Sequence, residues 1–183
     1  MNRPHCLDVS DAAVLQEYEQ AFYAAFQRVT GNRLIRDLWS WDDAGGRLAT
    51  RIPYEDQLIV AQRDDAGRMD TAIATNMALR EFQSSAFGFS PPSEPRGCCE
   101  FLTFFSVGNW RLAAKLRFWA ACFAELRARG YHTGYATTAQ RGLPIYRRIG
   151  GEVIGETEIS GEKRYFLRYS LERTTMRGAQ RFG

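Results

Sequence analysis

The chain has 183 residues, with 24 lysine and arginine residues against 21 aspartate and glutamate residues, so its net charge is +3. This length suits one domain with a buried core, and so small a charge does not indicate nucleic-acid binding. No long apolar run or secretory leader stands out and the four cysteines lack regular spacing, so we expect a cytoplasmic protein without a membrane span.

The N-terminal part predicts a short strand followed by two helices. His5–Val9 reads as the strand, and Ser10 is a suitable N-cap for a helix that begins at Asp11 and carries apolar residues at helical spacing. Residues 33–41 predict the second helix, and residues 42–46, with two glycines, predict a loop.

The next segment predicts a hairpin and then an unusual insertion. Residues 56–63 and 69–79 read as paired strands joined by a turn at 64–67 that contains a glycine. Residues 81–97 hold three prolines and three phenylalanines, and we expect them to form a flap near the substrate end of the sheet. Phe82, Phe87 and Phe89 would either line an acyl or acceptor pocket or anchor this loop.

The C-terminal half predicts strand, helix, strand and short helix, followed by a hairpin. Residues 98–107 are aromatic and β-branched, as in a buried strand, and residues 110–129 have one apolar helical face. A strand over 131–138 and a helix over 139–149, ended by Gly150-Gly151, come next. Residues 152–159 and 163–171 predict a final hairpin. Residues 173–183 form a basic tail that we expect to be flexible.

This order, together with Tyr146 just before the Gly150-Gly151 pair, resembles the C-terminal core of the GCN5-related N-acetyltransferases, the GNAT superfamily. The resemblance is strong from Cys98 to Leu171 and weak before Asp56. It implies an α/β fold with a mixed, twisted sheet of about seven strands and helices on both faces. Residues 1–172 would then be a single GNAT-like acyltransferase domain.

The resemblance also implies where a thioester donor binds. In the family, the N-terminus of the long helix binds the pyrophosphate of coenzyme A through free backbone N–H groups. The family pattern Arg/Gln-x-x-Gly-x-Gly/Ala aligns with Arg111-Leu112-Ala113-Ala114-Lys115-Leu116. Arg111 matches it, whereas Ala114 stands where glycine is usual and Leu116 where a small residue is usual. A solvated helix start is the alternative interpretation of Arg111 and Lys115. The pantetheine arm would contact the backbone around Phe105, Ser106 and Val107.

Two side chains are candidates for the acyl-transfer chemistry. Tyr146 stands at the family's position for the general acid that protonates the departing thiolate, and Glu100, the only charge on its strand, stands where a base often acts through water. The alternatives are a Tyr146 that packs under the sheet with its hydroxyl satisfied, and a Glu100 in solvent at the strand end. The amine acceptor would meet aromatic and acidic residues of the N-terminal part: Trp39, Trp41, Tyr54, Asp37, Asp42 and Asp43.

Other chemistry has weaker support in the sequence. The two histidines, His5 and His132, lie far apart without a cluster of Cys or Asp residues, so we expect no metal. The motifs of serine hydrolases and P-loop proteins do not occur. Cys98-Cys99 is best interpreted as a pair of buried thiols, because no partner histidine is indicated.

The function implied by the resemblance is transfer of an acyl group from acetyl-CoA or another acyl-CoA to an amine acceptor. The acceptor stays open among small amines, amino acids, antibiotics and protein N-termini. One alternative is a long-chain N-acyltransferase that takes its acyl group from an acyl-carrier protein. That carrier would dock on a basic face: Arg111, Lys115, Arg117, Arg147 and Arg148. The other alternative is a non-catalytic GNAT-like module that binds a ligand or a partner.

Overall fold

The backbone divides into two units. The computed structural model describes residues 3–27, 33–108 and 110–172. Unit 1 comprises residues 1–76 and 102–109, and unit 2 comprises residues 77–101 and 110–183. The single-domain prediction for residues 1–172 stays a prediction, and the basic tail at 173–183 lies outside the described residues.

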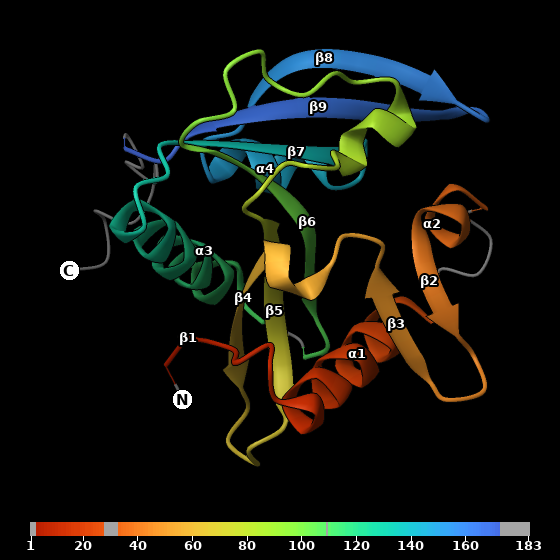
Figure 1. Cartoon of the computed structure of the whole chain (residues 1–183), viewed down its shortest axis with the longest axis vertical. Helices are drawn as coiled ribbons and strands as arrows, with labels where there is room; N and C mark the ends of the chain where they lie inside the picture. Colours follow the sequence, from red (N-terminus) through yellow and green to blue (C-terminus); the bar gives the residue numbers. More distant parts are fainter. Residues whose placement is uncertain (1–2, 28–32, 109, 173–183) are drawn as a thin grey trace. The chain divides into compact units, whose positions relative to one another are not determined.

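The elements follow the predicted order, with a hairpin over residues 39–50 and two short 3₁₀ helices in addition (Figure 1). Those of unit 1 are β1 (His5–Cys6), α1 (Ala12–Phe26), α2 (Arg33–Leu38), β2 (Trp39–Asp42), β3 (Arg47–Thr50), η1 (Tyr54–Asp56), β4 (Gln57–Arg63) and β5 (Met69–Asn76). The other elements are η2 (Gln83–Phe87), β6 (Cys98–Ser106, shared by both units), α3 (Leu112–Ala128), β7 (Thr133–Ala139), α4 (Leu143–Arg148), β8 (Glu152–Ile159) and β9 (Glu162–Ser170).

The strands form a seven-stranded mixed sheet of order β1-β4-β5-β6-β7-β9-β8 and a separate two-stranded sheet of β2 and β3. β6 and β7 are parallel, whereas the pairings of β4 with β5, β7 with β9 and β8 with β9 are antiparallel. The predicted α/β class and the seven-stranded mixed sheet are therefore confirmed.

The predicted N-cap of α1 is wrong by one residue. Asp11, not Ser10, caps the helix, because its Oδ1 accepts hydrogen bonds from the backbone N–H groups of Ala13 at 2.8 Å and Val14 at 3.3 Å. The hydroxyl and N–H of Ser10 instead donate to Asp8 Oδ1, at 2.6 and 3.0 Å. Both are capping residue types, so sequence alone did not separate them.

The predicted second helix is too long, because α2 ends at Leu38 and the chain continues as β2. β2 pairs with β3 from Trp39 opposite Thr50 to Asp42 opposite Arg47. The predicted loop at 42–46 is the turn of this hairpin, in which Asp42 Oδ1 accepts the N–H of Gly45 at 2.8 Å. Aromatic residues at alternate positions favour a strand once a partner strand is present.

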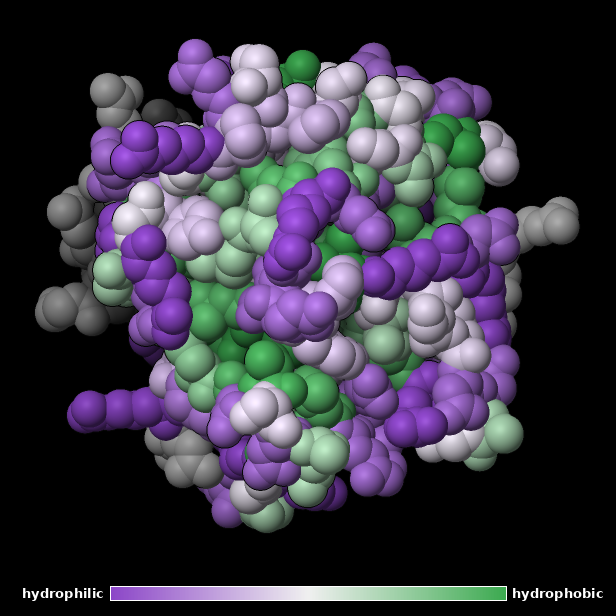
Figure 2. All heavy atoms as spheres, viewed as in Figure 1, coloured by the Kyte–Doolittle hydropathy of each residue, from purple (hydrophilic) through white to green (hydrophobic). Residues whose placement is uncertain are grey.

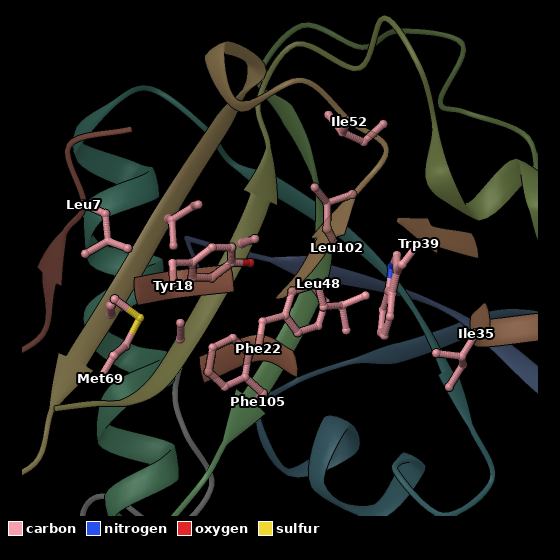
Figure 3. Close-up of a cluster of buried hydrophobic side chains, with 14 residues drawn as sticks. Leu7, Tyr18, Phe22, Ile35, Trp39, Leu48, Ile52, Met69, Leu102 and Phe105 are labelled. Atoms are coloured by element: carbon pink, nitrogen blue, oxygen red, sulfur yellow. The ribbon is translucent and has the colours of Figure 1, made fainter. Parts of the chain in front are cut away.

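The core of unit 1 lies between α1 and the strands (Figure 3). Phe22 and Phe105 stack with their ring centroids 5.5 Å apart, and Trp39 meets Phe22 edge-on at 4.9 Å. Tyr18 is fully buried, and its hydroxyl lies 3.4 Å from the hydroxyl of Thr103. Each aromatic ring buried here contributes about 2–3 kcal/mol by leaving water, so this cluster anchors α1 to its unit.

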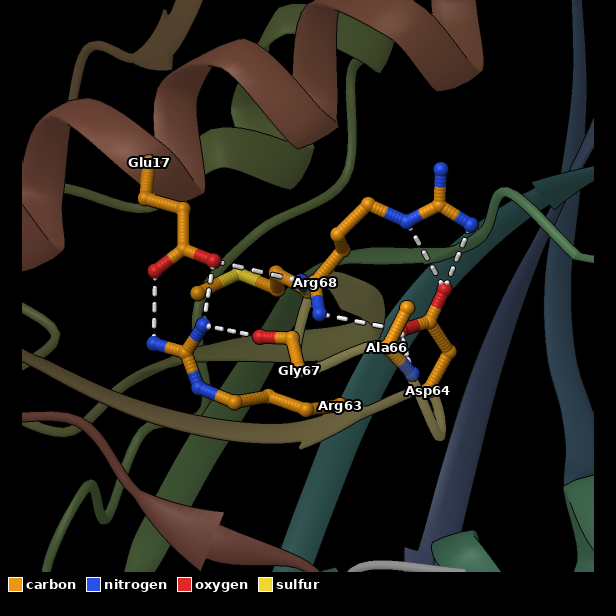
Figure 4. A network of polar contacts seen from close by, with 7 residues as sticks. Glu17, Arg63, Asp64, Ala66, Gly67 and Arg68 are labelled. Atoms are coloured by element: carbon orange, nitrogen blue, oxygen red, sulfur yellow. Dashed lines mark hydrogen bonds and ion pairs between the residues drawn. The ribbon is translucent and has the colours of Figure 1, made fainter.

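Ionic contacts also hold α1 to the β4–β5 hairpin (Figure 4). The guanidinium of Arg63 donates to both carboxylate oxygens of Glu17, and Arg63 Nη1 also donates to the carbonyl of Gly67 at 2.9 Å. Asp64 orders the turn itself, since its Oδ1 accepts the N–H groups of Ala66 and Arg68, each at 2.9 Å. The predicted glycine-containing turn is confirmed.

Unit 2 has a sheet with two different faces. In the register of β6, β7 and β9, Glu100 lies beside Tyr135, while the next residue, Phe101, lies beside Ala136. Because side chains alternate between faces along a strand, Glu100 and Phe101 point to opposite sides. The Phe101 side meets Trp119 of α3, and the Tyr135 side meets Phe82 of the flap, residues 81–97. We name these the helix face and the flap face.

The predicted boundaries in unit 2 differ from the structure by a few residues. The largest difference is at α4, which begins at Leu143 rather than at residue 139, because Ala139 is the last residue of β7 and residues 140–142 turn. The backbone at Gly142 packs closely against Thr138, since a Cβ on residue 142 would lie only 2.3 Å from the Thr138 hydroxyl oxygen.

On the visible surface, hydrophilic side chains are spread widely and hydrophobic ones show between them (Figure 2). Within the described ranges, no helix is both long and apolar enough to cross a membrane. No disulfide joins the four cysteines, all of which lie in those ranges.

Candidate active site

Glu100 lies fully buried on the flap face and holds the flap. Its Oε1 accepts hydrogen bonds from the backbone N–H of Ser84 at 2.7 Å and from the Ser84 hydroxyl at 2.6 Å, and its Oε2 accepts the N–H of Gln83 at 2.9 Å. These donors belong to the first residues of η2, whose exposed N–H ends favour a negative charge. The alternative of a solvent-exposed Glu100 does not agree with this burial.

Tyr146 lies half-buried on the helix-face side of unit 2. Its ring meets Trp119 of α3 edge-on, with ring centroids 5.9 Å apart, and Trp119 itself packs on Phe101 at 5.1 Å. Burial raises the pKa of Tyr146 to about 12, so its hydroxyl stays protonated at neutral pH. Tyr146 and Glu100 thus point from opposite faces of the sheet, and the structure does not bring the two side chains together.

The start of α3 offers backbone donors with two cations nearby. Arg111 is the N-cap, yet its side chain makes no capping hydrogen bond, and its carbonyl accepts the N–H groups of Ala114 and Lys115 at 2.9 and 3.2 Å. The N–H groups of Leu112 and Ala113 make no hydrogen bond within the described residues. A helix of this length with uncapped N–H groups is suited to an anion. Ala114, at the position of the family's glycine, is buried.

The cations around α3 and α4 share an unusual property. Residues 110–124 and 139–151 contain no aspartate or glutamate. The basic side chains of these two segments form no ion pair among the described residues: Arg111, Lys115, Arg117, Arg141, Arg147 and Arg148. Lys115 is half-exposed, and the five arginines are exposed. Because Trp119 contacts Tyr146, α3 and α4 are neighbours, so these cations lie on or beside two adjacent helices of unit 2.

The three residues predicted to contact the pantetheine arm lie in unit 1. Phe105 belongs to its core. The Ser106 hydroxyl accepts from Thr71 Oγ1 at 3.0 Å and donates to the carbonyl of Gly108 at 3.2 Å. The N–H of Val107 donates to the carbonyl of Asp70 at 2.8 Å, which leaves that N–H engaged within unit 1. A pantetheine contact at Val107 would therefore use its carbonyl.

The aromatic and acidic residues predicted for the acceptor are largely occupied by one another. Trp39 is buried in the core of unit 1, whereas Asp43 pairs with Arg36 at 2.8 Å and Asp42 pairs with Arg47 at 2.8 Å. A hollow of about 230 Å³ remains within unit 1, and it is lined by Glu19, Ser40, Trp41, Asp42, Arg47, Leu48 and Ala49. The acceptor prediction for this region stays a prediction.

Each phenylalanine of the flap touches the flap face. Phe89 stacks on Phe166 of β9 with ring centroids 4.8 Å apart, and Phe82 meets the same ring edge-on at 6.0 Å. The ring of Phe87 lies 5.0 Å from the guanidinium carbon of Arg164. These contacts favour the anchoring role over the pocket-lining role, although a ligand could share the same aromatic surface.

Within the described part of the chain, no three His, Cys, Asp or Glu side chains are grouped to hold a metal ion. Cys98 and Cys99 are buried, and burial raises the pKa of both thiols. A raised pKa leaves less thiolate, so these are poor nucleophiles.

Solved acyltransferase structures share this architecture. TofI in a ternary complex with an inhibitor and MTA has a TM-score of 0.73 at 16% identity, over 96% of this chain and 94% of TofI. BjaI, a CoA-dependent acyl-homoserine lactone synthase solved with SAM and isopentyl-CoA, has a TM-score of 0.71 at 18% identity, over 96% of this chain and 86% of BjaI.

The ribosomal-protein-S18-alanine N-acetyltransferase from Escherichia coli has a TM-score of 0.60 at 14% identity, over 93% of this chain and 94% of that chain. This chain has the GNAT fold. At the level of sequence, no family model and no curated protein matches it. The GNAT fold thus confirms the resemblance in architecture, and it leaves the residue roles as predictions.

Sequence reasoning missed two features of the site. The flap's attachment to Glu100 was not anticipated, although an isolated carboxylate in an apolar strand indicates a dedicated partner. Arg164 was also missed, since it looks like any alternating residue of a hairpin. Its burial depends on the flap, which covers it from a distant part of the chain.

Proposed function

We propose that this chain is an acyltransferase that moves an acyl group from a CoA thioester to an amine acceptor. The observation that carries the proposal is the start of α3 in a GNAT fold: two uncapped N–H groups beside Arg111 and Lys115, which have no ion-pair partner among the described residues. These groups suit the pyrophosphate of coenzyme A. BjaI, of the same fold, is described as CoA-dependent, which supports this choice of donor.

In the proposed reaction the nitrogen of a neutral amine attacks the thioester carbonyl carbon. The C–N bond forms, the C–S bond breaks, and one amine proton leaves to a base. Tyr146 donates its hydroxyl hydrogen to the departing sulfur and regains a proton from solvent. Its raised pKa, about 12, keeps that hydrogen in place at neutral pH until the sulfur carries charge.

Glu100 is the proposed base, acting through water. Its carboxylate already accepts three hydrogen bonds from Gln83 and Ser84. A base in this position can take up a proton only if the start of η2 shifts and releases the carboxylate. The flap would then control when the base works, and substitutions at Ser84 should alter the pH profile of turnover as well as stability.

The test is calorimetric titration with acetyl-CoA and, separately, with a long-chain acyl-CoA. We expect binding of at least one donor, with affinity reduced about 10-fold or more in the double variant Arg111→Gln, Lys115→Gln because charge-assisted phosphate contacts are lost. Arg129→Gln is the matched control, since Arg129 lies at the other end of α3 and pairs with Glu125 at 2.8 Å. Absence of binding to either donor would contradict the proposal.

The second candidate function keeps the chemistry but takes the acyl group from an acyl-carrier protein. The observation that favours it is the surface of exposed or half-exposed cations on residues 110–124 and 139–151, which exceeds what one pyrophosphate needs. Acyl-carrier protein and acyl-CoA with the same chain should be compared as donors. In the double variant Arg147→Glu, Arg148→Glu, turnover should fall with the carrier protein and not with acyl-CoA; equal loss with both would exclude carrier docking.

If no donor binds and no amine is acylated, the non-catalytic alternative gains support. In that case Tyr146→Phe would leave every measurable property of ligand binding unchanged.

A further inference from the structure

Arg164 is a buried cation whose hydrogen-bonding capacity is only partly used. Its residue is 7% exposed, and its Nη2 donates to Glu162 Oε2 at 3.0 Å. The Nε–H has no acceptor among the described residues, although the atom is completely covered. A buried N–H on a charged group without a partner is strongly unfavourable, so an acceptor from outside the chain is expected there.

The position of Arg164 is also informative. In the register of unit 2, Arg164 lies opposite Ala139, the last residue of β7, on the flap face. Ligands of open α/β sheets bind beyond the carboxyl ends of the parallel strands, and β7 is one of the parallel pair. Arg164 is therefore at the edge of unit 2 where a substrate is expected.

The surroundings of Arg164 favour a ligand that is partly apolar. The ring of Phe87 covers its guanidinium, and Phe166, two residues along the same face of β9, carries the rings of Phe82 and Phe89. The neighbouring strand β7 is half-exposed on this face, at Thr133, Tyr135, Thr137 and Ala139, and buried on the other. The flap face thus combines aromatic surface, partly exposed residues of β7 and one incompletely paired guanidinium.

We propose that Arg164 binds the carboxylate of the acceptor, so that the acceptor is an amino acid rather than a simple amine. This inference rests on the proposed function and specifies its substrate class. A guanidinium donates to a carboxylate through two parallel N–H groups, and Nε with Nη2 forms such an edge. Glu162, whose side chain is 31% exposed, accepts from Nη2 in this structure, and the substrate carboxylate would replace it there.

The placement agrees with the two faces of unit 2. The donor's anion site and Tyr146 belong to the side of α3 and α4, whereas Arg164 belongs to the flap face with Glu100. An amino acid held by Arg164 through its carboxylate would lie on the same face as the proposed base, which is where its amine must lose a proton.

The experiment compares matched acceptors. Glycine, leucine and phenylalanine are each assayed beside the corresponding amide and the corresponding decarboxylated amine, with whichever acyl-CoA binds. We expect KM to rise about 10- to 100-fold when the carboxylate is removed, as for loss of a charge-assisted pair in a covered site. In Arg164→Gln this discrimination should disappear, with amides and amines unaffected.

Arg168→Gln is the matched control, because Arg168 lies on the same face of β9 but is exposed and paired with Glu152 at 2.9 Å. It should keep the discrimination. If Arg164→Gln does not fold, Arg164→Lys is used in its place. It should retain part of the preference for amino acids over amides, because lysine keeps the positive charge but lacks the planar guanidinium edge.

Two results would overturn the inference: amides and amines accepted as well as amino acids, or Arg164→Gln lowering turnover of all acceptors alike. Calorimetric titration with the amino acids and their amides, without donor, separates this failure from failure of the proposed function. A preference for the amino acids that Arg164→Gln removes would uphold the site even if no acyl transfer occurs. Equal affinity for acids and amides would reject it even if transfer occurs.

Discussion

Arginines are used differently in the two units. In unit 1 four of them lie against a carboxylate: Arg36 on Asp43, Arg47 on Asp42, Arg63 on Glu17 and Arg68 on Asp64. In unit 2 the arginines at the start of α3 and on α4 have no such partner within the described ranges, while Arg129 and Arg168 do. Cations without a carboxylate partner in the chain are the candidates for binding an anionic ligand.

The largest effect is expected from Glu100, the buried anion of unit 2. Glu100→Ala should lower the free energy of unfolding by about 3 kcal/mol, because two backbone N–H groups and a hydroxyl lose their acceptor in a covered position. Urea unfolding measures this change. Glu156→Ala, an exposed residue of β8, is the control and should stay within about 0.5 kcal/mol. A Glu100→Ala protein as stable as the control would mean that the flap is not held as described.

The next effect is kinetic and concerns Tyr146. Tyr146→Phe should reduce kcat about 100-fold, because proton donation to the departing sulfur is lost, with little change in stability. Single-turnover assays with an acyl-CoA and an accepted amine provide the measurement. Tyr131→Phe, which removes a hydroxyl that donates to the carbonyl of Met77 before the start of β7, is the control. Equal kcat for Tyr146→Phe and the original protein would remove Tyr146 from the chemistry.

A smaller effect is expected at alkaline pH. The pKa of Tyr146 is about 12 in the folded chain and about 10 when unfolded, so the folded state holds this proton more tightly. The corresponding stability is present below pH 10 and is lost as the pH rises toward 12, by about 1 kcal/mol between pH 9 and pH 11. Urea unfolding at these two pH values should show a smaller loss in Tyr146→Phe. An unchanged loss would mean that Tyr146 is solvated like a free tyrosine.

The smallest effect tests the paired charges of unit 1. Glu17→Gln should cost about 1 kcal/mol of stability, since the Arg63 pair is half-exposed, and the cost should shrink in high salt. It should leave donor affinity unchanged, in contrast to the Arg111→Gln, Lys115→Gln variant. A loss of donor affinity in Glu17→Gln would contradict the assignment of donor binding to the unpaired cations of unit 2.

Much of the fold was predictable from local patterns. Gly67 and Gly161 lie in turns with φ of +80° and +77°, which glycine adopts without strain, and both hairpins were placed correctly around them. The β2–β3 hairpin was missed because Trp39 and Trp41 fit a helical face as well as a strand. Only pairing with β3 decides between these, and pairing is not a local property.

The candidate site was predictable only in part. Sequence order located Tyr146 and the start of α3, because both depend on elements next to them in the chain. It did not predict that Glu100 and Tyr146 point from opposite faces, or that the flap covers Glu100 and Arg164. Those relations depend on the register of β6, β7 and β9 and on a segment distant from Arg164 in sequence.

The two faces of unit 2 have a consequence for the order of substrate binding. In the proposed reaction the donor approaches from the side of Tyr146 and the acceptor from the side of Glu100, so neither must leave before the other arrives. Initial-rate plots should then intersect, as for a ternary complex, instead of running parallel as for an acyl-enzyme. Free coenzyme A should compete with the acyl donor and not with the amine, because the product leaves the donor subsite at the start of α3, which the acceptor does not use.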